Sequence, residues 1–260
     1  MITQQPLDRV PILVLLVAFV LLSLAAYEIG YRSGHRFKER NPDAPEGPTG
    51  VIVGAILGLM AFLLAITMGI ASDRFDTRRG LVLQETNALG TAYLRAGYLS
   101  EPASSDSRAL LREYVPLRIA TSDVAEVNAK IEQSEELQED LWAITEETAR
   151  TEGSDVVALY VESVNEIIDL HTTRFVAGVY ARVPPTILWL LVAGVFLSVG
   201  LVGYNAGIDK RRSPVIVAVL VVALGAVLWL VVDLDRPQDG LLNVSQQPLI
   251  DLQERLESSP

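Results

Sequence analysis

The sequence predicts an all-α membrane protein with four transmembrane helices and an inserted water-soluble helical bundle. Half of its 260 residues are hydrophobic and its mean hydropathy is positive, which is common in small multi-span membrane proteins and unusual in soluble domains. The hydrophobic residues gather into four almost uncharged stretches, residues 10–26, 51–71, 185–204 and 214–232. A long acidic and amphipathic region separates the second stretch from the third.

The four stretches have lengths that suit a bilayer. An α-helix rises 1.5 Å per residue, so about 20 apolar residues cross a hydrocarbon core of roughly 30 Å. The second, third and fourth stretches meet this length. The first is shorter, and Ser23-Leu24-Ala25 would suit a signal peptidase, so a cleaved signal peptide is the alternative there. The basic block at 31–40 follows at once and favours a retained span.

The region between the spans is expected to be helical throughout. From Ser72 to Tyr98 only glycines interrupt a helix, so the second span should continue as one long rod. Beyond a turn at 101–105, apolar residues recur every three or four positions in two stripes, from Val124 to Ile144 and from Val157 to Phe175. We therefore expect an antiparallel bundle that is continuous with the second and third spans.

The chain thus divides into four predicted parts. Residues 1–71 form the first transmembrane pair with a basic loop, and residues 72–184 form the acidic helical extramembrane domain. Residues 185–232 form the second transmembrane pair, and residues 233–260 form a C-terminal tail.

Composition excludes several function classes. The chain has no cysteine, so disulfides, thiolate metal sites and cysteine nucleophiles are absent. Its two histidines make a zinc or haem site improbable, and a net charge of −11 repels nucleic acid. The water-facing part offers no nucleophile motif or phosphate loop, so we expect no enzyme and no cofactor. The spans carry no Asp, Glu, Lys, Arg or His, which removes the usual parts of a proton relay.

Lysine and arginine in the short loops predict the orientation. The loop at 28–50 and the turn at 205–213 share one side and hold seven basic residues. We expect both in the cytoplasm of a multi-pass inner-membrane protein, with the acidic domain outside. Arginines directly after the second span oppose this assignment.

Those arginines belong to the first candidate site. It comprises Arg74, Asp76, Arg78, Arg79, Glu85 and Asn87. At 100° per residue, Arg74, Arg78 and Glu85 lie within about 40° of one another, whereas Asp76, Asn87 and Tyr98 lie on the far side. One face would be an ionic ladder or a pore mouth, and the other a polar helix contact. The alternative is simple anchoring, with arginines reaching toward lipid headgroups.

The second candidate site follows the fourth span and comprises Asp233, Asp235, Arg236, Gly240 and Ser245. The span count places it on the same side as the arginine cluster. We expect these charges to pair with that cluster, because Asp-x-Asp alone is weak evidence for a metal site. By contrast, His171 lies within an apolar stripe and is expected to be a packed structural residue.

Glycine spacing marks the third candidate site. Gly50, Gly54 and Gly58 recur every four residues on the second span. Small residues in this pattern let helices approach closely, so we expect a helix contact within or between subunits.

These polar segments also resemble a known family. The runs are Arg74-Phe75-Asp76-x-Arg78-Arg79, Glu85-x-Asn87-Ala88-x-Gly90-Thr91-Ala92-Tyr93-Leu94-Arg95, Asp235-Arg236-Pro237-x-x-Gly240 and Val244-Ser245-x-x-Pro248. They are similar to those of the bacterial membrane family of unknown function called bestrophin-like, over nearly the whole chain. More distantly, the chain resembles bestrophins, which are pentameric, calcium-activated anion channels with four transmembrane helices per subunit.

The resemblance implies a homo-oligomer, a pentamer by analogy, in the bacterial inner membrane. It also implies membrane lipids and inorganic anions such as chloride as partners, and calcium as a candidate ion. The aromatic pore neck and calcium-clasp sequence of bestrophins have no recognisable counterpart here. The leading hypothesis is an anion-conducting channel with the second span lining the axis and Arg74, Arg78 and Arg79 forming a basic ring. The alternative is a non-conducting sensor or scaffold whose helical domain binds a partner.

Overall fold

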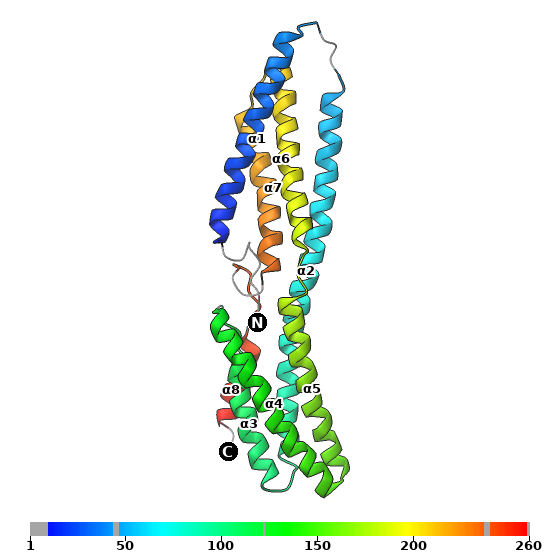
Figure 1. Cartoon of the computed structure of the whole chain (residues 1–260), viewed down its shortest axis with the longest axis vertical. Helices are drawn as coiled ribbons and strands as arrows, with labels where there is room; N and C mark the ends of the chain where they lie inside the picture. The colour runs from blue at the N-terminus through cyan, green and yellow to red at the C-terminus, as the bar shows by residue number, and fades with distance from the viewer. Residues whose placement is uncertain (1–9, 44–46, 122, 237–239, 259–260) are drawn as a thin grey trace. The chain divides into compact units, whose positions relative to one another are not determined.

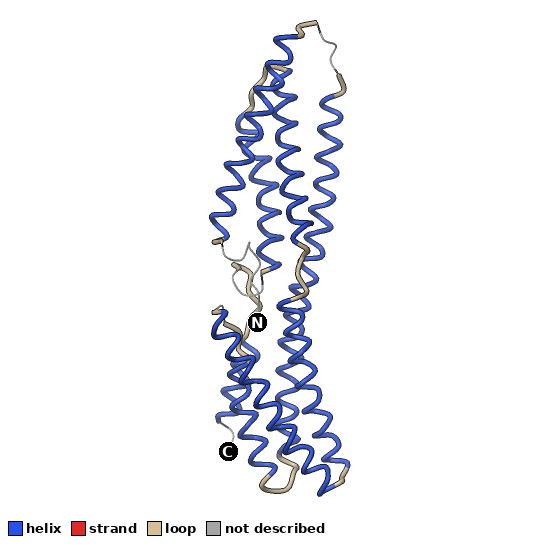
Figure 2. Tube along the Cα trace, viewed as in Figure 1, coloured by secondary structure: helices blue, strands red, loops and turns tan. Residues whose placement is uncertain are grey.

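The computed structural model describes residues 10–43, 47–121, 123–236 and 240–258, and these residues form only helices and connecting loops (Figures 1 and 2). The helices are α1 (Ile12–Arg40), α2 (Thr49–Ala96), α3 (Ala103–Leu117), α4 (Val124–Glu152), α5 (Asp155–Val179), α6 (Pro185–Ile208), α7 (Pro214–Asp235) and α8 (Gln247–Ser258). The prediction of an all-α chain is confirmed for this part of the protein.

The helices form two compact units. Among the described residues, the apolar unit contains 10–43, 47–73 and 183–236, and the polar unit contains 74–121, 123–182 and 240–258. Each unit is therefore assembled from separate parts of the chain. The tail, predicted as a part of its own, packs in the polar unit.

Among the described residues, four helices are long and apolar enough to cross a membrane: α1, α2, α6 and α7. The prediction of four spans is confirmed at this level. However, α1 continues to Arg40, whereas the sequence predicted a span of 10–26 followed by a loop. Two side-chain contacts one turn apart support the extra turns: the ion pair of Arg32 with Glu28 at 2.8 Å, and the approach of His35 Nε2 to Glu39 Oε1 at 3.3 Å.

Backbone contact between α1 and α6 holds the apolar unit together. A Cβ atom added to Gly30 or Gly34 would overlap a backbone carbonyl of α6, and one added to Gly203 or Gly207 would overlap a carbonyl of α1. Only glycine permits this approach, which is how small residues pack helices in membranes. The predicted strip at Gly50, Gly54 and Gly58 is different, since a Cβ atom added there meets nothing within 4 Å.

Helix α2 is one uninterrupted helix of 48 residues, as the rod prediction required. The predicted continuity of the bundle with the third span is wrong. Helix α5 ends at Val179 and α6 begins at Pro185. Pro184 is extended, with φ −54° and ψ 129°, because the residue before a proline avoids the α-helical region.

The polar unit has its own hydrophobic core. Residues from α2, α3, α4, α5 and α8 contribute, with Leu89, Leu111, Leu141, Ile167 and Leu249 among the fully buried side chains. Asp123 and Ser154 cap α4 and α5 by accepting hydrogen bonds from backbone N–H groups in the first turn. The apolar stripes seen in the sequence therefore contribute to this core through Leu137, Leu141, Val157, Val161, Val164 and Ile168.

Candidate functional site

A buried carboxylate on α2 lies at the centre of the polar unit. Glu85 is completely buried. Its Oε1 atom accepts a hydrogen bond from Arg118 Nε at 2.6 Å, and its Oε2 atom accepts one from Arg174 Nη1. The side chains of Arg118 and Arg174 are only 9% and 14% exposed. Three charges thus meet inside a helical core.

Arg174 extends this charge network to the tail. Its Nη1 atom donates to the carbonyl oxygen of Arg118 at 3.0 Å, and its Nη2 atom donates to Gln246 Oε1 at 2.9 Å. Gln246 immediately precedes α8, and its Oε1 also accepts from the N–H of Ala120. The network therefore joins α2, the end of α3, α5 and the residue before α8.

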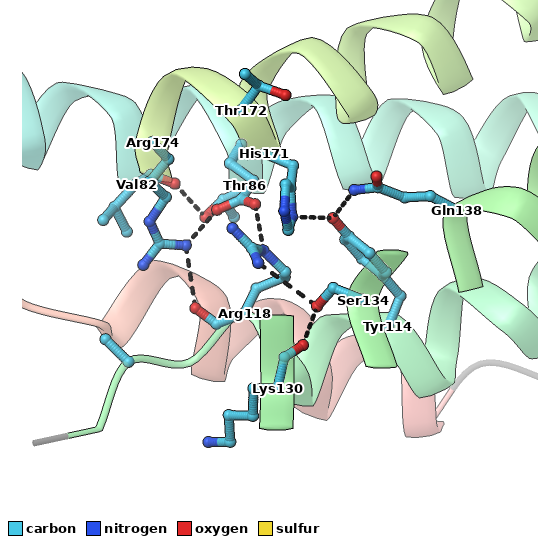
Figure 3. A network of polar contacts seen from close by, with 12 residues as sticks. Val82, Thr86, Tyr114, Arg118, Lys130, Ser134, Gln138, His171, Thr172 and Arg174 are labelled. Carbon is cyan, nitrogen blue, oxygen red and sulfur yellow. Dashed lines mark hydrogen bonds and ion pairs between the residues drawn. The ribbon is translucent and has the colours of Figure 1, made fainter. Parts of the chain in front are cut away.

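A second polar group adjoins it. Gln138 donates to the Tyr114 hydroxyl at 2.7 Å, and that hydroxyl lies 3.4 Å from His171 Nδ1 (Figure 3). Figure 3 also shows Arg118 and Ser134 on the same side of the cluster, where their side chains are 3.5 Å apart. Tyr114 lies beneath the guanidinium of Arg118, 5.7 Å from the ring centroid. As expected, His171 is a packed side chain, 6% exposed.

Burial and the neighbouring charges set the protonation states. Burial alone would raise the pKa of Glu85, but Arg118 and Arg174 outweigh it and hold that pKa below its usual value. Burial, assisted by Arg118, lowers the pKa of His171 to about 4. Burial also raises the pKa of Tyr114 to about 12. At neutral pH the cluster therefore contains an ionised Glu85, two cationic arginines, and a neutral His171 and Tyr114.

This arrangement suits a structural connection better than chemistry. Every acidic and basic group at its centre is already paired, and buried paired charges fix one arrangement of the surrounding helices. Within the described residues, no three His, Cys, Asp or Glu side chains gather so as to hold a metal ion. Calcium as the candidate ion stays a prediction.

The structure separates the residues of the first predicted site. Arg78 and Glu85 are buried, Arg74 is half-buried, and Arg79, Asp76 and Asn87 are exposed. The predicted division of this helix is therefore visible in the burial pattern: Asp76, Asn87 and Tyr98 lie on the exposed side. Of the three arginines, only Arg79 is exposed in the single chain, and the arginine ring stays a prediction.

The second predicted site lies at the end of α7. Asp233, Asp235 and Arg236 are 0%, 1% and 3% exposed. Asp235 Oδ1 accepts a hydrogen bond from the Val183 N–H at 2.7 Å, and Arg236 Nη2 donates to the Val10 carbonyl at 2.9 Å. This motif thus ties the ends of three segments of the apolar unit together. Its pairing with the arginine cluster stays a prediction.

The remaining two residues of that site lie further along the tail. Gly240 is half-buried. Ser245 is exposed, and its hydroxyl accepts a hydrogen bond from the Gln247 N–H at the start of α8. Ser245 therefore helps to begin the tail helix. Residues 237–239 lie outside the described residues.

One line of α2 is open along the whole helix. We call it the α2 strip, and its members recur at steps of three and four: Gly54, Gly58, Phe62, Ala65, Gly69, Asp73, Asp76, Gly80, Leu83, Asn87, Thr91 and Leu94. All are exposed except Gly80, which is half-buried. In the apolar unit the strip is small or apolar as far as Gly69 and ends at Asp73, and in the polar unit it carries Asp76, Asn87 and Thr91.

The sequence did not identify the partners of Glu85. Arg118, Arg174 and Gln246 are far away along the chain, and nothing in their local patterns distinguishes them from surface residues. The available signal was Glu85 itself. It lies on the same side of α2 as Leu89 and Ala92, and a carboxylate on an apolar side requires a cationic partner.

The fold has known relatives. A crystal structure of a bacterial Bestrophin homolog from Klebsiella pneumoniae is similar with a TM-score of 0.65 and 17% identity, covering 93% of this chain and 95% of that chain. A mutated form of such a homolog from the same organism gives a TM-score of 0.70 and 15% identity, covering 93% and 97%. Identities this low show the fold alone.

The sequence itself carries a family assignment. No curated protein matches it closely enough to add one. Residues 16–249 match the family described as Bestrophin-like domain, which is most of the chain. This chain therefore belongs to the Bestrophin-like family.

Proposed function

We propose that this chain is the subunit of a homo-oligomeric ion channel in which the α2 strips of several copies line a common axis. The observation that carries the proposal is the strip itself. Along the described part of α2, one line is open from Gly54 to Leu94, while the opposite side packs into hydrophobic cores.

The chemistry of the strip favours an aqueous axis over lipid. Within the span, glycine and alanine leave room beside the helix, whereas lipid-facing positions elsewhere in the protein carry large residues such as Leu13, Val215 and Leu190. Phe62 is the largest side chain on that part of the strip and is 61% exposed. A ring of Phe62 side chains would form an apolar constriction, which gates ions by dewetting.

Beyond the span, the strip becomes polar. Asp76, Asn87 and Thr91 are exposed there and would line the water-filled continuation of the axis. The helices of the polar unit carry acidic outer surfaces, with Glu135, Glu136 and Glu139 exposed on α4, which fits a water-soluble bundle around that axis.

The finer assignments follow the family. The proposal includes a pentamer in the bacterial inner membrane, with lipids around it and the basic loops in the cytoplasm. It also includes conduction of inorganic anions such as chloride, for which exposed Arg79 is the supporting cation. Exposed Asp73 and Asp76 act against anions, because rings of acidic side chains favour cations. The reversal potential measured across a salt gradient shows whether anions or cations are conducted.

Cysteine modification tests the axis directly, because the chain has no cysteine of its own. In planar bilayers, we expect the variant Asn87→Cys to lose most of its conductance after a charged methanethiosulfonate reagent is added. The matched control is Glu136→Cys, an exposed position on α4, which should react without a change in current. Absence of conductance in the unmodified protein, over a range of salts, pH and calcium, would contradict the channel.

The alternative is a non-conducting sensor or scaffold, favoured by the acidic surface of α4. It predicts a monomer or dimer, whereas the channel requires enough copies to enclose an axis. The mass of the native particle in detergent separates the two.

A further inference from the structure

Basic side chains gather at one end of the apolar unit, where α1 ends and α6 turns into α7. We call them the basic patch: Arg32, Arg36, Arg40, Lys210, Arg211 and Arg212. The whole chain has a net charge of −11, so this concentration of cations runs against the overall charge. All six residues are exposed.

The patch is held together by Glu28. This carboxylate accepts hydrogen bonds from Arg32 Nε at 2.8 Å on its own helix and from Arg212 Nη2 at 3.3 Å across the unit. The Arg212 guanidinium also lies 4.0 Å from the centroid of the Tyr31 ring. The glycine contact between α1 and α6 fixes the distance between these two segments. The cations are therefore assembled by the fold.

Within the described part of the chain, Arg36, Arg40, Lys210 and Arg211 donate to no carboxylate. The two acids nearest in sequence are engaged elsewhere, Glu39 with His35 and Asp209 with Asn205. These exposed cations are therefore accessible to an anion from outside.

Aromatic residues near the basic patch indicate its depth in the membrane. Tyr27 stacks on Tyr31, Tyr31 stacks on His35, and Phe37 lies beside Tyr204. Trp189 and Trp229 lie toward the opposite ends of α6 and α7. Tyrosine and tryptophan concentrate at the two membrane–water interfaces. The position of this aromatic group, at the ends of the spans opposite the two tryptophans, favours a basic patch at the level of lipid headgroups.

We propose that the basic patch is a binding site for anionic phospholipid headgroups of one leaflet. One guanidinium group can donate two parallel hydrogen bonds to two oxygen atoms of a phosphate. The side chains of Arg36 and Arg211 are exposed and therefore accessible to such a headgroup. The apolar surface of α1 beside the patch, including Ile29 at 67% exposure, would accept the acyl chain. The site does not depend on ion conduction and would exist in a non-conducting protein.

Native mass spectrometry of the purified, detergent-solubilised protein tests this. Wild-type protein is titrated with phosphatidylglycerol or phosphatidylcholine, and bound lipids are counted. We expect phosphatidylglycerol to be retained preferentially, and the double variant Arg36→Gln, Arg211→Gln to bind it about tenfold more weakly, because each basic group near a surface adds attraction for anionic lipid. Binding of phosphatidylcholine should not change.

The matched control removes two other exposed arginines, in the variant Arg150→Gln, Arg255→Gln, and should bind phosphatidylglycerol like wild type. Equal retention of both lipids by wild type, or an unchanged double variant, overturns the proposal. A third arm adds excess inorganic phosphate. If it displaces the lipid, the patch is a site for free phosphate and the lipid assignment is wrong.

Discussion

Removing the carboxylate of Glu85 should destabilise the polar unit strongly. In the variant Glu85→Gln, Arg118 and Arg174 remain buried without their shared anion. Arg174 keeps two acceptors, the Arg118 carbonyl at 3.0 Å and Gln246 at 2.9 Å. Among the described residues, Arg118 keeps Ser134, at 3.5 Å, and the ring of Tyr114. The amide oxygen of the new glutamine can still accept a hydrogen bond, but it carries no compensating negative charge. Two adjacent positive charges then face one another inside a core.

The magnitude follows from burial. The side chain of Glu85 is 0% exposed, and the side chains of Arg118 and Arg174 are 9% and 14% exposed. Breaking a buried ion pair from one side costs about 3–5 kcal/mol. For a chain of this size, 1 kcal/mol lowers the melting temperature by about 2–4 °C, so we expect a fall of about 6–20 °C.

Tryptophan fluorescence can report on the polar unit alone. The chain has three tryptophans, and only Trp142, on α4, belongs to that unit. In a background of Trp189→Phe and Trp229→Phe, thermal unfolding followed at Trp142 measures the effect of Glu85→Gln. Glu136→Gln, an exposed glutamate on α4, is the control and should shift the midpoint by less than about 2 °C.

A triple variant separates charge burial from packing. Replacing all three charged residues, as Glu85→Leu, Arg118→Met and Arg174→Met, should recover most of the lost stability, because an apolar set of similar volume has no desolvated charge. A shift below about 2 °C in Glu85→Gln, or a triple variant no more stable than the single one, would refute our account of the network.

Three further changes test other contacts, each followed by thermal or denaturant unfolding. The pKa of His171 falls from 6.5 to about 4 on folding, so on acidification the unfolded state takes up a proton before the folded state does. The free energy of unfolding should therefore decline by up to about 3 kcal/mol as the pH falls from 6.5 to 4. His171→Gln should flatten that decline, and an unchanged slope in this variant would contradict the assignment. Gly203→Val places a side chain against the Tyr27 carbonyl and should lower the free energy of unfolding by about 3 kcal/mol or more. Gly54 has open space around it, so Gly54→Val should change the free energy of unfolding by less than about 1 kcal/mol. Leu252→Ala, at a site 3% exposed in the core of the polar unit, should cost about 2–4 kcal/mol, and an effect no larger than that of exposed Glu254→Ala would show that α8 is not part of this core.

The sequence was sufficient for the features that depend on local patterns. The apolar stretches predicted the four candidate spans, since length and hydropathy are read directly along the chain. Helical phase also separated Asp76 and Asn87 from Glu85 correctly. Both properties need only neighbouring residues within one helix.

The sequence was insufficient for predicting contacts between segments that lie far apart along the chain. Arg118 and Arg174 lie 33 and 89 residues from Glu85 along the chain, and no local pattern selects them from the other arginines. The length of α1 was underestimated for a similar reason. Its last turns are charged, and they stay helical partly because Gly30 and Gly34 pack against α6, a contact invisible before α6 is placed.

The buried face of α8 has a consequence for the timing of folding during synthesis. Leu249, Leu252 and Leu256 complete the core of the polar unit, and Gln246 completes the charge network. The ribosome makes them only after α6 and α7. The helices α3 to α5 must therefore wait, with part of their apolar surface uncovered and Arg174 lacking one acceptor, while two membrane spans are inserted.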